Sequence, residues 1–223
     1  SIMYDIIRKI SSGKKINFSN AGSSKLNLES DKSVFNLNCI AQSEPVKPNI
    51  LLIVSDDQGL YDVSYYGTKD IKTPSIDFIA KTGIRLDNFY ANSPVCSPTR
   101  ASIMTGLYPD RAGVPGVIRT NPLNSWGHLR TDVNILPAEL KKLGYNSALI
   151  GKWHLGIDSP NLPNLRGFDF FHGWLGDMMD DYWNHLRHNI NYMRLNENTI
   201  KVEGHATDLF SEWSVNYIKS VSY

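Results

Sequence analysis

The sequence predicts an α/β fold with a mostly parallel sheet and helices on both faces, and three observations favour it. Residues 50–54 form a short, continuous apolar run (ILLIV) that is typical of a strand buried on both sides. Helix-like segments that end in glycine follow it along the chain. Residues 145–150 then have the composition of another strand. Alternating strands and helices indicate a parallel sheet covered by helices.

The bulk composition excludes several classes of protein. The 223 residues are 41% hydrophobic and 20% charged, which fits a folded globular chain. The net charge of +1 provides no general field that would attract nucleic acid. No run of eighteen apolar residues occurs, so we expect no membrane span. Only two cysteines are present, Cys39 and Cys96, which is too few for a disulfide framework.

The chain divides into a tail and a folded part. Residues 1–48 are rich in Ser, Asn and Lys and show no sustained period, so we predict a poorly ordered tail or linker. Residues 49–223 are predicted to form the folded part. Its first strand, residues 50–54, ends in Asp56 and Asp57. Ligands bind at the carboxyl ends of strands in open α/β sheets, so both carboxylates lie where a ligand is expected.

Two helices and one strand are predicted next. Thr73 as N-cap and Pro74 in the first turn predict a helix over residues 74–81. The alternation in residues 84–90 predicts a strand. A second helix follows and ends at Gly106, and Pro98 near its start places Cys96 at its N-terminus.

The remaining elements lead to a second polar cluster. Residues 136–143 are predicted to be helical, and the strand 145–150 leads into Lys152 and His154. Residues 158–198 lack a clear period and are expected to be irregular. Residues 208–218 have the pattern of an amphipathic helix with Thr207 as its cap.

Three groups of reactive side chains fall at the same predicted edge of the sheet. Each has a structural alternative: the carboxylates could cap a turn, Cys96 could be a small buried apolar residue, and Lys152 and His154 could form an exposed loop. Paired carboxylates favour a hard cation such as Ca²⁺, for which sulfur is a poor ligand. The conflict disappears if oxygen replaces the sulfur of Cys96.

These residues resemble a known family. The segment Cys96-Ser97-Pro98-Thr99-Arg100 matches the C-x-P-x-R signature of formylglycine-dependent (type I) sulfatases. Residues 144–156 (GYNSALIGKWHLG) resemble the second sulfatase signature, and residues 48–59 (PNILLIVSDDQG) resemble the first strand and its metal-binding acids. The resemblance covers about residues 48–220, the N-terminal part of such an enzyme. Arylsulfatases and N-acetylgalactosamine-6-sulfatases are similar members.

The resemblance implies an alkaline-phosphatase-like fold and a sulfuric ester hydrolase that acts on sulfated small molecules or glycans. A formylglycine-generating or anaerobic sulfatase-maturating enzyme would oxidise Cys96 to formylglycine. Asp56 and Asp57 would bind Ca²⁺ together with the formylglycine oxygen.

The resemblance also assigns roles to three further residues. Arg100 would steady the formylglycine, Lys152 would hold the sulfate, and His154 would hydrogen-bond the aldehyde hydrate and assist its breakdown. It also suggests a secreted, periplasmic or lysosomal protein, although the sequence shows no clear signal peptide.

The family pattern requires further residues that we expect beyond Tyr223: a second histidine, an Asp-Asn or Asp-Gln pair and another lysine. Residues 1–223 alone are therefore expected neither to hydrolyse sulfate esters at an enzymatic rate nor to bind Ca²⁺ tightly. Two alternatives remain open: a phosphatase or phosphodiesterase of the same superfamily, and a non-catalytic fragment. The first normally uses Ser or Thr as nucleophile, which disfavours it here.

Seven other polar side chains also have predicted positions. The histidines are expected in loops and the acids at the rim of the substrate pocket; they are His172, His185, His188, His205, Asp177, Asp180 and Asp181.

Overall fold

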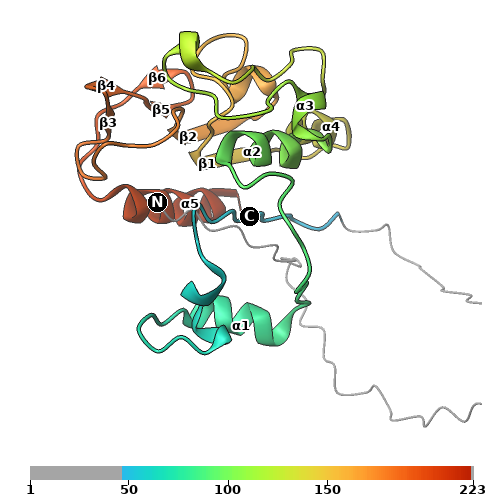
Figure 1. The fold of residues 1–223 in the computed structure, drawn as a ribbon, viewed down its shortest axis with the longest axis vertical. Helices are drawn as coiled ribbons and strands as arrows, with labels where there is room; N and C mark the ends of the chain where they lie inside the picture. The colour runs from blue at the N-terminus through green and yellow to red at the C-terminus, as the bar shows by residue number, and fades with distance from the viewer. Residues whose placement is uncertain (1–46, 222–223) are drawn as a thin grey trace, which may run out of the picture. The chain divides into compact units, whose positions relative to one another are not determined.

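The computed structural model describes residues 47–221. The compact unit Ser55–Tyr223 contains all the helices and strands named below (Figure 1). Residues 47–54 belong to a different unit, Tyr4–Val54, and contain no strand. The predicted tail lies almost wholly outside the described residues and stays a prediction.

The described elements are as follows. The helices are α1 (Pro74–Thr82), α2 (Cys96–Thr105), α3 (Pro109–Ala112), α4 (Leu136–Lys142) and α5 (Ala206–Val221), with short 3-10 helices at Leu60–Asp62, Ser64–Tyr66, Pro122–Asn124 and Asn164–Arg166. The strands are β1 (Ala148–Lys152), β2 (Phe170–Trp174), β3 (Leu186–Arg187), β4 (Ile190–Asn191), β5 (Met193–Leu195) and β6 (Asn198–Thr199).

The described strands form a mixed sheet of order β1-β2-β5-β6 and a separate β3-β4 ribbon. Strands β1 and β2 are parallel, whereas β2-β5 and β5-β6 are antiparallel. The two-residue connection between β5 and β6 forces an antiparallel pair, and Asn196 in that turn has φ +52°, as a tight hairpin requires. The expectation that residues 158–198 are irregular is therefore wrong for β2 to β6.

Two predicted strands do not form. Residues 50–54 have no strand conformation, and Ile50 and Leu52 are 52% and 42% exposed. Residues 84–90 are exposed and contain a turn at Asp87. Apolar composition alone does not make a strand, because a central strand needs hydrogen-bonding partners on both sides. Among the described strands, β1 pairs only with β2.

The two parallel strands approach closely where Gly151 lies opposite Gly173. A Cβ atom added at Gly173 would lie 2.0 Å from the backbone oxygen of Gly151. Only a residue without a side chain fits this position, so the register that leads β1 into Lys152 depends on Gly173.

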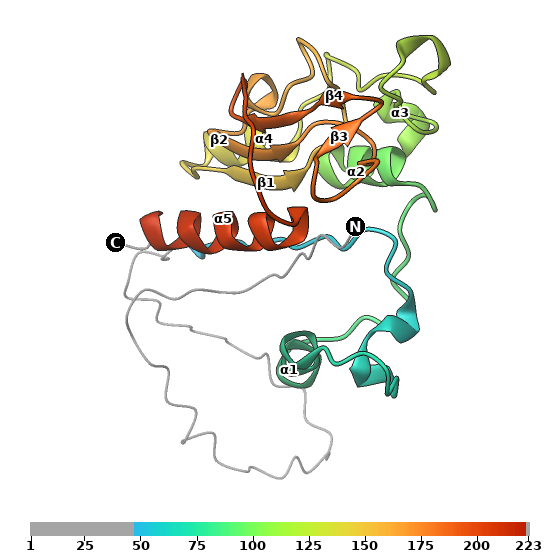
Figure 2. The same cartoon turned by 90° about the vertical axis from the view of Figure 1, so that its left-hand side faces the viewer.

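Helix α5 covers one face of this sheet (Figure 2). Its Trp213 stacks on His172 of β2 with ring centroids 3.4 Å apart, and Tyr217 stacks on Phe170 at 5.0 Å. The predicted apolar side of the helix is thereby confirmed. The helix begins at Ala206, before the predicted start, and the ring of His205 accepts a hydrogen bond from the Thr207 amide.

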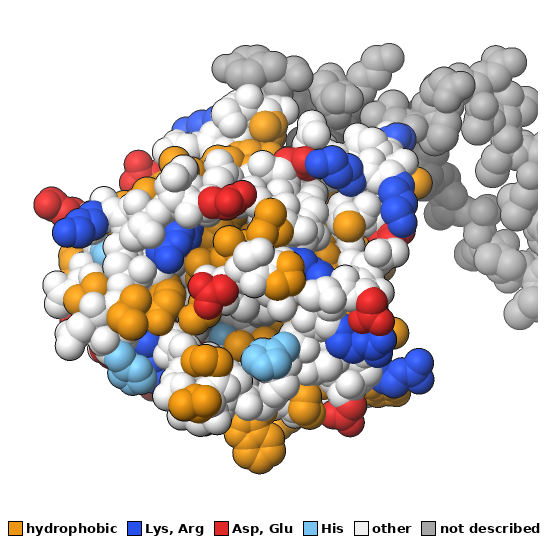
Figure 3. Space-filling view, turned by 90° about the horizontal axis from the view of Figure 1, so that it is seen from above, with side chains coloured by type: hydrophobic (Ala, Val, Ile, Leu, Met, Phe, Trp, Pro, Cys, Tyr) orange, Lys and Arg blue, Asp and Glu red, His pale blue; other side chains and the backbone are white. Residues whose placement is uncertain are grey.

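The core lies between the sheet and the helices. Its largest fully buried side chains include Leu129, Ile135, Trp153, Leu155, Phe171, Trp174, Leu175 and Met193. Of the predicted helices, the first, second and third correspond to α1, α2 and α4 within one or two residues. On the face drawn in Figure 3, positive and negative side chains are interspersed, in keeping with the small net charge.

Candidate active site

Cys96 is the first residue of α2, as Pro98 predicts. The preceding Val95 is extended, and its carbonyl accepts the first helical hydrogen bond from the Thr99 amide. The Thr99 hydroxyl donates a 2.6 Å hydrogen bond to the carbonyl of Ser93 and so fixes the chain that enters the helix. Cys96 carries a free, half-buried thiol at the end of α2 where unpaired amide groups point outward.

Arg100, one turn after Cys96, connects three segments of the site. Its Nη1 donates a 2.8 Å hydrogen bond to the carbonyl of Lys152 at the end of β1. Its Nη2 lies 3.6 Å from Oδ2 of Asp56. Arg100 is buried, so the guanidinium ties helix α2 to both neighbouring segments inside the protein.

The buried ion pair of Lys152 and Asp56 lies beside this arginine. The ammonium of Lys152 donates to Oδ2 of Asp56 at 2.7 Å, and each residue is 8% exposed. Burial alone would raise the pKa of Asp56, but the charge and hydrogen bond of Lys152, together with Arg100, hold it below its usual value. Asp56 is therefore an anion that joins two buried cations.

His154 is connected to the helix of Cys96 through a single backbone unit. Its Nε2 lies 2.7 Å from the carbonyl oxygen of Ile118, which can only accept, so Nε2 carries the proton. The amide of Ile118 in turn donates to the hydroxyl of Ser97 at 3.1 Å. Main-chain atoms of Ile118 thus link the histidine to the residue beside Cys96.

The protonation state of His154 follows from its surroundings. Burial, and then the nearby charge of Lys152, lower its pKa to about 3. At neutral pH the ring is uncharged and its Nδ1 presents a lone pair. This buried Nδ1 has no hydrogen-bond partner among the residues the structure describes. A buried polar atom without a partner indicates a position that a further group can occupy.

Two of the site residues have left-handed backbone conformations. The φ angles are +57° for Asp57 and +56° for His154. Such angles are uncommon outside glycine and cluster at functional sites. Asp57 is exposed, so its carboxylate lies at the surface, whereas that of the adjacent Asp56 is buried.

The residues present fit a hard cation in the type of donor that they offer. Asp56 and Asp57 supply carboxylate oxygens, which Ca²⁺ prefers, and Cys96 would supply oxygen only after oxidation. Within residues 47–221 no three His, Cys, Asp or Glu side chains gather into a ready metal cluster. The described residues therefore match such an ion in donor chemistry but do not gather into a metal cluster.

The expectation of loop positions is wrong for His172 and confirmed for His185, His188 and His205, which lie outside helices and strands. Among the histidines, His172 lies in β2 under α5, and His185 is buried with its Nε2 donating to the carbonyl of Gly204. Asp177 and Asp180 both pair with Arg187, at 3.2 and 2.8 Å.

The last acid and the last two histidines lie in turns or at a helix end. Asp181 accepts two backbone amides in a tight turn, and His188 lies in the turn between β3 and β4. His205 is in a loop as expected, but its ring caps α5.

Sequence reasoning did not identify Ile118, whose main chain links Ser97 and His154, and no signal in the sequence points to it. It acts through its main chain, so its residue type carries no information about the role. Among the described residues no helix is long and apolar enough to cross a membrane.

Comparisons with known proteins agree with the resemblance. The family model described as Sulfatase matches residues 48–220. The chain is 43% identical over 136 residues to human steryl-sulfatase, covering 57% of this chain and 23% of that protein. It is 38% identical over 158 residues to human N-acetylgalactosamine-6-sulfatase, covering 67% of this chain and 30% of that protein. The chain thus spans less than a third of the length of either relative.

A solved structure shows the fold. The crystal structure of Ps i-CgsB in complex with k-i-k-neocarrahexaose is 32% identical, with a TM-score of 0.66, and the match covers 74% of this chain and 40% of that one. The predicted alkaline-phosphatase-like fold is therefore confirmed for the part of the domain that the chain spans. Together with the family match over most of its length, this shows that the chain belongs to the sulfatase family.

Proposed function

We propose that this chain is part of a sulfuric ester hydrolase that cleaves sulfate monoesters of sugars through a formylglycine formed from Cys96. The observation that carries the proposal is the convergence of Arg100, Lys152 and His154 on the start of α2, where Cys96 lies. The resemblance places Arg100 and His154 on the formylglycine and its hydrate and Lys152 on the sulfate.

The cationic residues suit an anionic substrate. Lys152 is held at the end of β1 by its contact with Asp56, and Arg100 is fixed by the Lys152 carbonyl. An ammonium held in this way can contact a sulfate oxygen without first losing conformational freedom. Such preorganised charge is a main source of catalysis. Losing one such contact typically costs about 3 kcal/mol of barrier, on the order of a hundredfold in rate.

His154 suits the aldehyde hydrate. Its neutral ring keeps Nε2–H on Ile118, and Nδ1, which has no hydrogen-bond partner among the described residues, would accept a hydrogen bond from a hydroxyl at residue 96. That hydrogen bond would orient the hydrate and assist its breakdown. Because Nε2 is already bonded to the carbonyl, the ring orientation is set before substrate arrives.

Asp56, Asp57 and the formylglycine oxygen would hold Ca²⁺. When bound, this ion would neutralise charge that spreads over the sulfate oxygens in the transition state. Ca²⁺ takes six to eight oxygen ligands, so these three residues do not fill its coordination sphere. We therefore expect the 223-residue chain alone to be inactive and to bind Ca²⁺ weakly.

Peptide mass spectrometry tests the proposal. The chain is produced with and without a formylglycine-generating enzyme, and the peptide that contains Cys96 is expected to carry the aldehyde and its hydrate only with the enzyme. Cys39 is an internal control, because it lies outside the C-x-P-x-R motif and should keep its thiol. Arg100→Ala should lower the modified fraction. An unmodified Cys96 in a competent host would overturn the assignment.

A further inference from the structure

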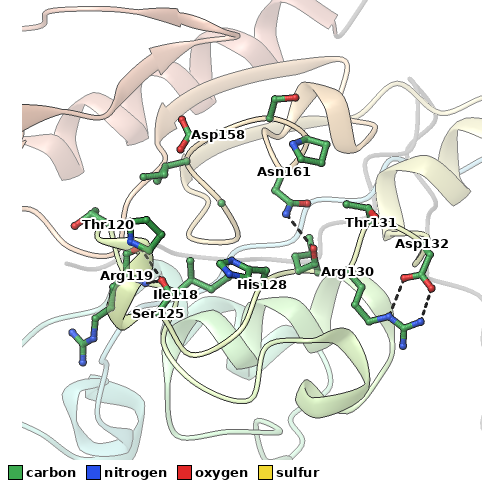
Figure 4. A pocket seen from close by; sticks show the side chains of 16 residues that line it. Ile118, Arg119, Thr120, Ser125, His128, Arg130, Thr131, Asp132, Asp158 and Asn161 are labelled. Carbon is green, nitrogen blue, oxygen red and sulfur yellow. Dashed lines mark hydrogen bonds and ion pairs between the residues drawn. The ribbon is translucent and has the colours of Figure 1, made fainter.

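A groove of about 540 Å³, lined by both polar and apolar side chains, begins at Ile118, whose main chain links Ser97 and His154 (Figure 4). One wall starts at Ile118, whose amide bonds Ser97 and whose carbonyl accepts from His154. The other wall is the segment 156–161, which starts two residues after His154. Both walls therefore lead away from the site of the proposed nucleophile.

Most charged side chains along the groove are already engaged or point elsewhere. Arg130 and Asp132 pair through two hydrogen bonds and neutralise each other. The side chain of Arg119 extends away from the other labelled residues (Figure 4). Asn161 donates to the carbonyl of Leu129 and braces the two walls against each other.

The side chains of His128 and Asp158 remain available to form hydrogen bonds with a ligand. They come from opposite walls, and among the described residues neither the His128 ring nor the Asp158 carboxylate makes a hydrogen bond or an ion pair (Figure 4). Both are exposed, so their polar atoms are bonded to water when the groove is empty. A ligand that displaces this water must offer hydrogen bonds in return.

We infer that this groove holds the uncharged, hydroxyl-rich ring that carries the sulfate, with Asp158 and His128 bonding its hydroxyl groups. The inference rests on the proposed function and names the part of the chain that selects the substrate. A cavity of this volume lies within the usual range for small ligands. The apolar side chains of Ile157 and Pro160 offer contact to the C–H faces of a ring.

Two kinds of sulfate ester are disfavoured by the same residues. A steroid ring would cover Asp158 and His128 without hydrogen bonds, and an unpaired polar group is costly to desolvate. A second sulfate on the part of the ring that enters the groove would face the negative charge of Asp158. The groove therefore favours a neutral sugar over a sterol and over a doubly sulfated ring.

Binding to the 223-residue chain tests the inference by ligand-observed NMR titration. The probes are N-acetylgalactosamine, its 6-sulfate, glucosamine 2-N,6-O-disulfate, estrone sulfate and inorganic sulfate. Asp158→Ala and His128→Ala are each expected to weaken binding of both N-acetylgalactosamine probes by about tenfold, while leaving inorganic sulfate unchanged. Asp70→Ala removes an exposed carboxylate that does not line the groove and serves as the matched control.

The outcomes separate this inference from the proposed function. Unchanged sugar binding in both folded variants, or preferred binding of estrone sulfate or of the disulfate, would overturn the groove assignment. If sugar binding falls in the variants while Cys96 stays unmodified in the mass-spectrometric test, the groove stands and the proposed chemistry fails. If Cys96 is modified normally while sugar binding is unaffected in both variants, the proposed chemistry stands and the groove assignment fails.

Discussion

The buried ion pair of Asp56 and Lys152 should be strongly coupled, and a double-mutant cycle can measure the coupling. Asp56→Ala leaves two cations, Lys152 at 2.7 Å and Arg100 at 3.6 Å, without their shared anion. Breaking a buried pair by removing one partner typically costs about 3–5 kcal/mol, because the remaining charge stays buried. We expect the free energy of unfolding to fall by that amount.

The double variant Asp56→Ala/Lys152→Met should lose less free energy of unfolding than the two single variants lose together. Arg100 keeps its hydrogen bond in all of them, since it donates to the backbone carbonyl of Lys152. The double variant contains one buried cation fewer than Asp56→Ala, and a coupling energy of about 2 kcal/mol is expected. Urea unfolding with a chelator present gives the free energies without any contribution from a bound ion.

The pair Glu139 and Lys142 is a matched control. Its N–O distance is also 2.7 Å, but its side chains are 47% and 62% exposed. An exposed pair is expected to couple by about 0.5 kcal/mol. If the Asp56–Lys152 pair shows no more coupling than this control, then burial does not strengthen it and the argument is refuted.

Three further outcomes are expected. Gly173→Ala should destabilise the chain by more than about 3 kcal/mol in urea unfolding, because its Cβ would collide with the backbone of Gly151; a loss below 1 kcal/mol would contradict the close approach. Burial lowers the pKa of His172 to about 4. The free energy of unfolding therefore decreases as the pH falls from about 6.5 towards 4, because the unfolded chain binds a proton there that the folded chain does not. His172→Phe should keep the stack on Trp213 and reduce this loss between pH 7 and 5, and an unchanged loss would argue against it. Arg166 donates to three carbonyls within residues 130–133, so Arg166→Met should cost about 3 kcal/mol in thermal unfolding, more than Arg166→Lys.

Local signals in the sequence were sufficient for α1, α2 and α4 and for the position of Cys96 at the start of α2. Pro74, Pro98 and Pro137 each lie in the first turn of a helix, and such positions depend on a few neighbouring residues. The C-x-P-x-R spacing likewise places Cys96 and Arg100 one turn apart on α2, whatever the rest of the fold.

Strands depend on partners distant in sequence, and this is where the sequence reasoning failed. The run 50–54 has the composition of a buried strand but no strand conformation, whereas Phe170–Trp174 forms β2 and carries no clear period. Its partners are 22 residues before it in β1 and 19 to 23 residues after it in β5, by the pairs Ala148↔Phe170, Trp174↔Met193 and others. A window of ten residues contains none of this information.

The use of the Ile118 main chain has a consequence for how the selectivity of this protein can change. A peptide group is the same in nearly every residue, so the link between Ser97 and His154 does not depend on which side chain stands at position 118, proline excepted. Side chains farther along the groove wall can then be exchanged without disturbing the orientation of the histidine. Transplanting residues 119–132 from a relative with another substrate should therefore transfer preference while conserving the chemistry, which makes this loop the natural place to redesign the protein.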